Sequence, residues 1–119
     1  MARIELGFKT LATQAVAAAG TAQPLDGAAP GTPNLVRQVV VQWNTGNTGD
    51  VYIGESDVAA GKCIVLNSSN PTFSFQAEDT VADEDNCFVD MNKIYIDAAN
   101  TGDTVRVAYM SLEDKAYNS

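Results

Sequence analysis

Hydrophobic and polar residues alternate near the start of the chain with the period of a β-strand. In residues 3–9, the apolar residues Ile4, Leu6 and Phe8 are separated by polar residues and one glycine. Successive side chains of a strand point to opposite faces, so this spacing places the three apolar side chains on one face. Residues 11–19 are rich in alanine, which favours helix, but the run is short and uncharged and a glycine follows it. We predict a strand over residues 3–9 and a strand or extended arm over residues 11–19.

The strongest strand pattern lies in the middle of the chain. Residues 36–43 are rich in valine and end in Trp43, and residues 44–50 consist only of Asn, Thr, Gly and Asp. Because Gly and Asn adopt positive φ at low cost, residues 44–50 are predicted to be a turn. Residues 51–53 then return as the partner strand and complete a β-hairpin. A shorter version of this pattern, with strands at 91–97 and 104–110 around a turn at 98–103, closes the domain.

The remaining segments complete an all-β pattern. Short strands are expected at residues 63–66 and 73–76, and a brief one at 87–89. Residues 20–34 contain three prolines and several glycines and form a loop by composition, and residues 78–86 form an acidic loop. About seven or eight short strands at intervals of roughly ten residues predict an antiparallel β-sandwich with an extended N-terminal segment.

The length and composition fit one domain with three parts. The 119 residues include 45% hydrophobic residues, which is enough to bury a core. We assign residues 1–34 to an N-terminal arm and a Pro/Gly-rich loop, residues 35–110 to the sandwich core, and residues 111–119 to a frayed polar tail.

The net charge limits the classes of partner. At −8 the chain is repelled by phosphate backbones and by anionic lipid surfaces, so we expect neither nucleic-acid nor membrane binding. The charge favours solubility or a basic partner surface. No apolar run approaches the about 18 residues of a membrane span, and we find no export-signal pattern, so synthesis and first use in a cytoplasm are expected.

The residues that carry chemistry do not assemble into a catalytic or cofactor motif. The chain has no histidine, and Ser56 beside Asp57 lacks the strand–turn–helix setting of a hydrolase nucleophile, so a capped turn is favoured. The acidic residues between 78 and 90 lack the spacing of a calcium loop, and a solvated loop is favoured over a cation site. Cys63 and Cys87 are expected to be free thiols, with a bridge formed outside the cell as the alternative. We predict no catalytic residue, metal or cofactor.

Two binding interactions are considered from the sequence, sugar binding by aromatic residues and strand addition by the N-terminal segment. Four aromatic residues that could line a sugar-binding platform all lie in predicted strands, and most of them are assigned to the core instead: Trp43, Tyr52, Tyr95 and Tyr109. The apolar residues of the arm are exposed unless they pair with another sheet edge, and strand addition between chains would cover them. An ordinary first strand of the sandwich explains them equally well. The candidate partner contacts are Arg3, Ile4, Leu6, Phe8, Pro24, Leu25, Pro30 and Pro33.

Two motifs carry a family resemblance over residues 35–110. The first is the Asn/Gly turn at 44–47 followed by Val-Tyr-Ile-Gly-Glu-Ser-Asp-Val at 51–58. The second is Ile-Tyr-Ile-Asp at 94–97 followed by Gly-Asp-Thr-Val-Arg-Val at 102–107. Together they resemble small tailed-phage virion proteins of the capsid decoration, or cement, type. Between these motifs the chain departs from the family pattern, with Ser-Ser-Asn-Pro at 68–71 and an additional acidic loop.

The resemblance implies a fold and a role. It implies a jelly-roll-like sandwich, often a homotrimer, that sits on the capsid exterior of the virion and bridges subunits of the major capsid protein. The protein would be present in the host cytoplasm during assembly. A head-fibre or tail-associated phage module is the first alternative, and a carbohydrate- or calcium-binding sandwich is the second. Physically, a cement protein needs a rigid sheet core and an extended segment that reaches its neighbours, and this chain offers both.

Overall fold

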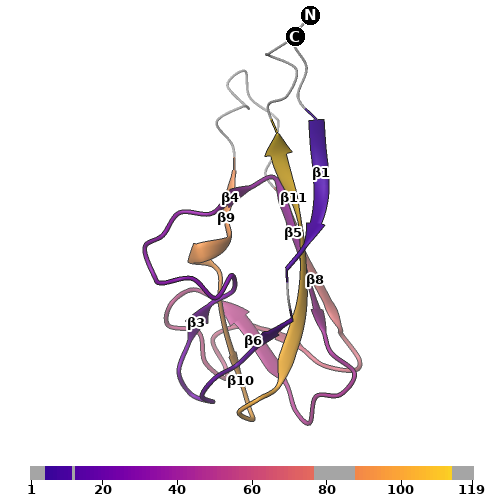
Figure 1. The fold of residues 1–119 in the computed structure, drawn as a ribbon. Coiled ribbons are helices and arrows are strands. Elements are labelled where there is room, and N and C mark those ends of the chain that lie inside the picture. Colours follow the sequence, from indigo (N-terminus) through magenta and orange to yellow (C-terminus); the bar gives the residue numbers. More distant parts are fainter. Residues whose placement is uncertain (1–4, 12, 77–87, 114–119) are drawn as a thin grey trace, which may run out of the picture.

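The fold is a sandwich of two antiparallel sheets, given by a computed structural model that describes residues 5–11, 13–76 and 88–113 (Figure 1). In the first sheet, which we call the long sheet, the strand order is β1-β11-β5-β8, and β2 also pairs with β11. Its strands are β1 (Glu5–Thr10), β2 (Gln14–Ala15), β5 (Gln38–Trp43), β8 (Thr72–Gln76) and β11 (Thr104–Glu113).

The second sheet, which we call the short sheet, has the order β3-β10-β6-β7. Its strands are β3 (Gln23–Pro24), β6 (Val51–Gly54), β7 (Ile64–Leu66) and β10 (Tyr95–Ala98). A separate two-stranded ribbon joins β4 (Leu35–Val36) to β9 (Val89–Asp90), and the 3₁₀ turn η2 (Met91–Lys93) follows it. The predicted antiparallel β-sandwich is therefore confirmed.

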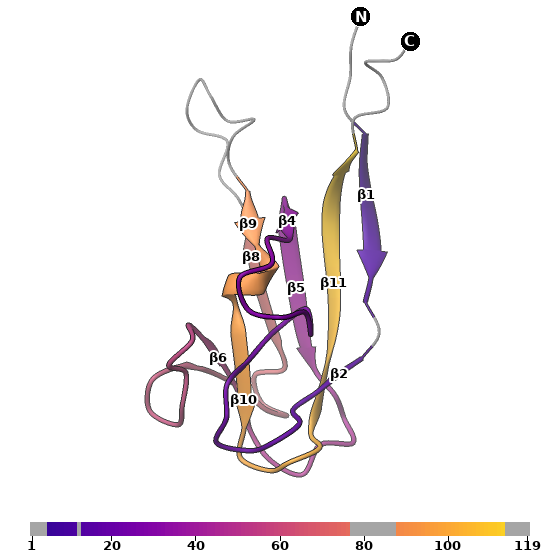
Figure 2. The same cartoon turned by 60° about the vertical axis from the view of Figure 1, so that its left-hand side comes forward.

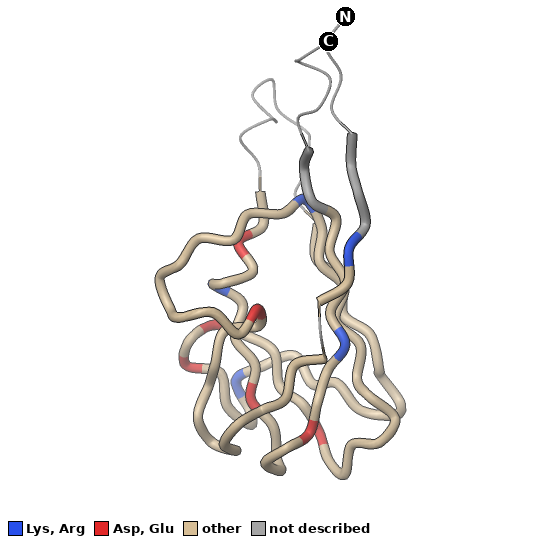
Figure 3. The backbone as a smooth tube through the Cα atoms, in the orientation of Figure 1, with Lys and Arg blue, Asp and Glu red and all other residues tan. Residues whose placement is uncertain are grey.

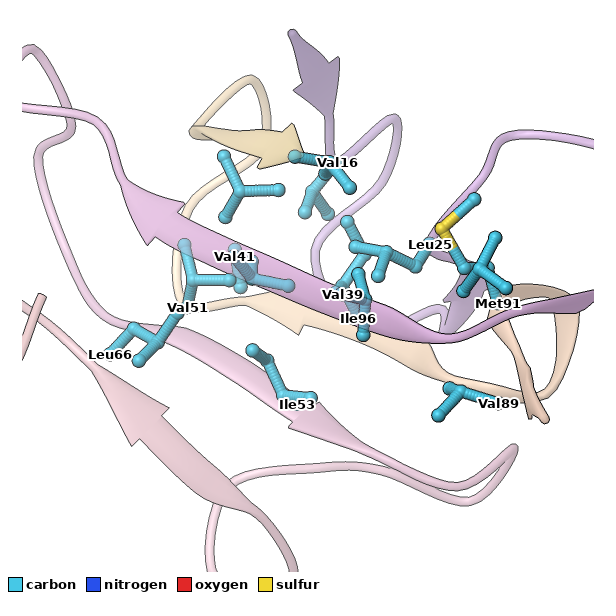
Figure 4. Close-up of a cluster of buried hydrophobic side chains, with 14 residues drawn as sticks. Val16, Leu25, Val39, Val41, Val51, Ile53, Leu66, Val89, Met91 and Ile96 are labelled. Atoms are coloured by element: carbon cyan, nitrogen blue, oxygen red, sulfur yellow. The ribbon is translucent and has the colours of Figure 1, made fainter. Parts of the chain in front are cut away.

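The core lies between the two sheets and follows the period of two (Figure 4). In β5, Val39 and Val41 are fully buried, whereas the residues between and beside them are half-buried or exposed. They face Val51 and Ile53 of β6 and Ile96 of β10, which are buried from the other side. Burying each of these aliphatic side chains stabilises the fold by about 2 kcal/mol, so the alternation selects one register for both sheets.

The topology shows that both predicted hairpins are wrong. β5 lies in the long sheet and β6 in the short sheet, so residues 44–50 cross between the sheets, and residues 99–103 do the same between β10 and β11. The β6 strand instead forms a hairpin with β7, with Val51 opposite Leu66. Alternation marks a strand but does not identify its neighbour, and a seven-residue loop can span the about 10 Å between packed sheets. Chain segments that pass from sheet to sheet side by side give the jelly-roll-like arrangement.

The two crossing loops pack against each other and form what we call the loop corner (residues 44–50 and 98–103). The buried Asp103 carboxylate accepts hydrogen bonds from the Thr48 N–H at 3.1 Å and the Gly49 N–H at 3.0 Å. The Asn47 amide bonds both the N–H and the carbonyl of Thr104, at 2.8 and 2.7 Å. The Trp43 indole N–H donates to the Gly49 carbonyl at 2.9 Å. The repeated Asn, Thr, Gly and Asp residues of the two motifs thus bond to each other.

The reason for glycine in residues 44–50 differs from the prediction, whereas Gly102 on the other side of the corner does have positive φ. Neither Gly46 nor Gly49 has positive φ. A Cβ on Gly49 would lie 2.6 Å from Nδ2 of Asn100 and 3.3 Å from the Cβ of Ala99. Gly49 therefore allows the two loops to approach closely, and positive φ is not what the loop requires.

Three smaller expectations are resolved by the structure. The strand at 3–9 is confirmed over its described residues as β1, and Arg3 and Ile4 lie outside the described residues. In the 11–19 segment only Gln14–Ala15 form a strand, β2, which is followed by the buried Val16, and residues 17–19 form a bend and the start of a turn. Residues 91–93 form a 3₁₀ turn and not a strand, because the Asp90 side chain accepts the Asn92 N–H and caps the turn. The polar tail is partly strand, since β11 continues to Glu113. The acidic loop at 78–86 lies outside the described residues.

Candidate functional site

A two-stranded extension of the long sheet is the first candidate for a functional surface (Figure 2). β1 pairs with β11 from Glu5 opposite Glu113 to Thr10 opposite Ala108. β5 pairs with β11 only as far as Gln38 opposite Met110. Residues 5–7 and 111–113, which we call the terminal ribbon, therefore continue beyond β5 as two strands. The molecule is correspondingly elongated, with extents of 50 × 26 × 24 Å.

The arm residues named from the sequence lie in or before this ribbon. Leu6 and Phe8 occupy β1 opposite Leu112 and Met110, and Arg3 and Ile4 lie outside the described residues. On the outer face of the neighbouring strands, Val40, Ala108 and Met110 are half-buried and apolar. They are outward because the alternate residues Val39 and Val107 are fully buried. The outer face of the long sheet beside β1 therefore carries a small apolar group, next to the polar Gln38 and Arg106.

The Pro/Gly-rich loop is only partly a surface. Leu25 is fully buried in the core and Pro24 is buried within β3, so in this fold both contact their own chain rather than a partner. The prediction that Pro24 and Leu25 contact a partner is therefore wrong. β3 pairs with β10, and Leu25 directly after it bonds the Ile94 carbonyl, so both side chains are buried in this chain's own core. Pro30 and Pro33 are exposed and remain available.

The exposed part of this loop is held by a network of buried amide and carboxylate groups. The Asn92 side chain is 3% exposed and its Oδ1 accepts the N–H groups of Gly31 at 2.9 Å and Thr32 at 3.1 Å. Its Nδ2 donates to the Asp26 carboxylate and to the Ala29 carbonyl, both at 3.1 Å. Every hydrogen-bonding position of this amide is used, and the loop therefore has one defined conformation.

This rigid loop forms one wall of a cavity of about 490 Å³, which we call the loop cavity. Its other walls are the start of the β6–β7 connection, the turn η2 and the first residue of β10. The lining residues are Gly31, Pro33, Glu55, Ser56, Asp90, Asn92, Lys93 and Tyr95. A second cavity of about 370 Å³ lies beside Trp43 and Arg106 near the loop corner.

The predicted capped turn at Ser56 is confirmed as a turn, and its acid is not positioned as a catalytic base. The Val58 N–H donates to the Glu55 carbonyl at 2.9 Å and closes the turn. The Asp57 carboxylate bonds Lys62 Nζ at 2.7 Å, and this exposed ammonium lowers the pKa of Asp57, while Asp57 raises the pKa of Lys62. Asp57 is thus paired with a lysine and not with Ser56. Among the described residues, no group of three acidic, Cys or His side chains could hold a metal ion.

The aromatic residues divide between core and surface. Trp43 and Tyr109 pack against the core cluster, as predicted. Burial, with the nearby Asp50 carboxylate as a smaller cause, raises the pKa of Tyr52. Tyr95 is half-buried and lines the loop cavity.

Of the two cysteines, Cys63 is a half-buried free thiol, and Cys87 lies outside the described residues.

The sequence places Glu55 and Ser56 together in one turn but gives no sign that they meet Pro33 and Tyr95. It also does not point to Asp26 and Asn92, whose bonds shape the cavity wall across 66 residues of chain. The available signal was weak, because Asn and Asp in a Pro/Gly-rich region also occur in ordinary turns. Only the pairing of β10 with β3 and β6 places these distant residues around one space.

The comparisons with known proteins leave the chain without an assigned family. In the part of the chain that the structure describes, no helix is long and apolar enough to cross a membrane. No family model, no curated protein and no solved structure matches the chain.

Proposed function

We propose that this protein is a non-enzymatic capsid decoration protein that binds the exterior of a phage head and bridges subunits of the major capsid protein. Its extended end would contact the neighbouring subunits. The observation that carries the proposal is the terminal ribbon, which continues the long sheet past β5. The two sequence motifs that resemble phage decoration proteins supply the class of partner.

The ribbon is suited to a partner for a physical reason. Beyond Met110, no described strand pairs with the side of β11 that faces β5 lower in the sheet, although β4 lies close to β11. Two strands alone are marginally stable in water, and an unpaired strand edge is a template for another strand. A strand of a capsid subunit or of a second copy of this chain would continue the sheet at this place.

The rest of the molecule fits an exterior position. Figure 3 shows the described charged residues along the backbone. Asp26, Glu55 and Asp97 lie in or beside strands of the short sheet, as do Lys62 and Lys93, and Lys9 and Arg106 lie in β1 and β11 of the long sheet. An acidic outer side reduces association between neighbouring particles. Many copies on one shell would gain avidity from weak individual contacts and would stabilise the assembled capsid.

The first test is the location of the chain. Purified virions of the phage that encodes it should contain the protein, and electron microscopy should place it on the head exterior with three-fold clusters. Absence from the virion would end the proposal. Density on the tail or at a fibre base would instead identify the alternative phage module.

The second test addresses the ribbon. Full-length protein and a variant lacking residues 1–7 are added to particles stripped of the protein, and attachment is measured by co-sedimentation. We expect the deletion to abolish attachment while its circular dichroism keeps the β-sheet signal. The control is Ser69→Ala, a change in the exposed turn between β7 and β8, which is not part of the terminal ribbon. This variant should attach normally. Equal attachment of all three proteins would show that the ribbon is not the contact.

A further inference from the structure

The loop cavity has no role in the proposed capsid contact, and its lining has the chemistry of a sugar site. We propose that it binds one neutral sugar residue of a glycan. The cavity is formed by the Pro/Gly-rich loop, the β6–β7 connection, η2 and β10, and none of these belongs to the terminal ribbon. The inference therefore holds or fails independently of the proposed function.

Several lining residues carry polar groups that have no hydrogen-bond partner among the described residues. Ser56, Lys93 and Tyr95 line the cavity, and their hydroxyl and ammonium groups form no hydrogen bond or ion pair within the described part of the chain. The Glu55 carboxylate forms none either, although it lies close enough to Lys62 to act on its charge. A sugar presents several hydroxyl groups that both donate and accept, and donors and acceptors of both kinds are available here.

Two lining groups are held rigidly, which reduces the entropy lost on binding. Oδ1 of Asp90 accepts the N–H groups of Asn34 at 2.9 Å and Asn92 at 3.0 Å, so this carboxylate is fixed while Oδ2 is not used by these bonds. Asn92 fixes Gly31 through the bond described above, and Pro33 adds a stiff residue to the same wall. Such preorganisation favours a small ligand that makes few contacts.

Tyr95 supplies the apolar surface that a sugar also needs. A sugar ring has an apolar face of C–H groups, which packs on an aromatic ring, and hydroxyl groups around its rim. Tyr95 is half-buried in β10, paired with Gly54 on one side and Pro24 on the other, so the ring is anchored by the short sheet. The cavity of about 490 Å³ lies in the range of small-ligand sites and accommodates one or two sugar rings.

The charges of the lining disfavour the other ligand classes. Glu55 and Asp90 repel phosphate and other anions, and Lys93 opposes a cation. The described residues offer no set of three metal-binding side chains. Although much of the lining is apolar, Glu55, Asp90 and Lys93 disfavour a purely apolar ligand, because its binding would leave these charged groups without water or partner. A neutral polyhydroxylated ligand is the class that satisfies all of them.

The test is a titration of the ¹⁵N-labelled full chain with galactose, glucose, mannose and N-acetylglucosamine, followed by NMR. A single ring should bind with a Kd on the order of 1 mM, and the amide shifts should cluster at residues 31–33, 55–56 and 90–95. Glu55→Gln should weaken binding about tenfold, since a hydrogen bond to a charged group is lost. Tyr95→Phe keeps the aromatic face and should weaken binding less.

A matched control distinguishes loss of a lining carboxylate from loss of negative charge nearby. Asp57→Asn removes one negative charge from the same connection but does not change a lining residue, and it should leave sugar affinity unchanged. The proposal is overturned if none of the four sugars shifts the cavity amides, or if Glu55→Gln and Asp57→Asn bind alike. It is also overturned if lysine methyl ester or inorganic phosphate binds there more tightly than every sugar.

Discussion

The loop corner and the terminal ribbon lie at opposite ends of β11 and use their polar backbone groups in opposite ways (Figures 1 and 2). In the corner, Asp103 and Asn47 satisfy the backbone of two loops that are far apart in the sequence. In the ribbon, β11 loses its neighbour β5 beyond Met110. The closed end contributes to the stability of the single chain, and the open end is suited to contacts with other chains. The predictions below test this division.

The largest expected effect is in the core that joins the two ends. Leu25→Ala removes a fully buried side chain and leaves a cavity, so the free energy of unfolding should fall by about 3 kcal/mol. Urea denaturation followed by circular dichroism measures this change. Leu35→Ala is the control, because Leu35 is 53% exposed and should change stability little. Similar losses for both variants would contradict the placement of Leu25.

Replacement of the Asp103 carboxylate in the loop corner should lower the stability nearly as much as Leu25→Ala. Asp103→Ala leaves the N–H groups of Thr48 and Gly49 without their acceptor, and we expect a loss of about 2 kcal/mol in the free energy of unfolding. Asp103→Asn keeps one acceptor oxygen and should lose about half as much. Denaturation curves of the two variants test the order. If alanine is tolerated as well as asparagine, these bonds do not stabilise the corner.

The close approach of the two loops is tested at their glycines. Gly49→Ala brings a methyl group against Asn100 and Ala99 and should lower the free energy of unfolding by about 1 kcal/mol. Gly46→Ala, in the same loop with open space around it and without positive φ, should be neutral or slightly stabilising. Part of the Gly49→Ala loss should be recovered in an Asn100→Ala background, measured as a double-mutant cycle. Independent, additive effects would argue against the contact.

The ribbon should contribute least to the stability of the single chain. Deletion of residues 1–7 removes strand pairs that no third strand supports, so the free energy of unfolding should fall by less than about 1 kcal/mol. A deletion of residues 1–11 also removes Leu11, which packs against the core, and should cost more. Thermal unfolding of both truncated chains compares them. A large loss from the shorter deletion would make β1 part of the stability core and would favour the ordinary first-strand interpretation.

By itself, the sequence determined most of the longer strands and which of their side chains share a face, although it counted residues 91–93 as strand and residues 23–24 as loop. The alternation around Val39, Val41, Val105 and Val107 predicts which side chains are buried, because the side-chain period of a strand is a local property. It also identified residues 3–9 as a strand and residues 44–50 as a loop. The two motifs that suggested a phage decoration protein could be recognised for the same reason, because strands and turns are favoured by residue types close together in the sequence.

Only the tertiary structure decided which strands are neighbours and what the loops hold. Strand pairing depends on contacts between residues far apart in the chain, so the pattern at 36–53 fitted a hairpin as well as a crossing between sheets. The same long-range packing buried Leu25, brought Asn47 against Thr104, and gathered Glu55, Lys93 and Tyr95 around one cavity. These features arise from the balance of burial and hydrogen bonding over the whole fold, which no local pattern contains.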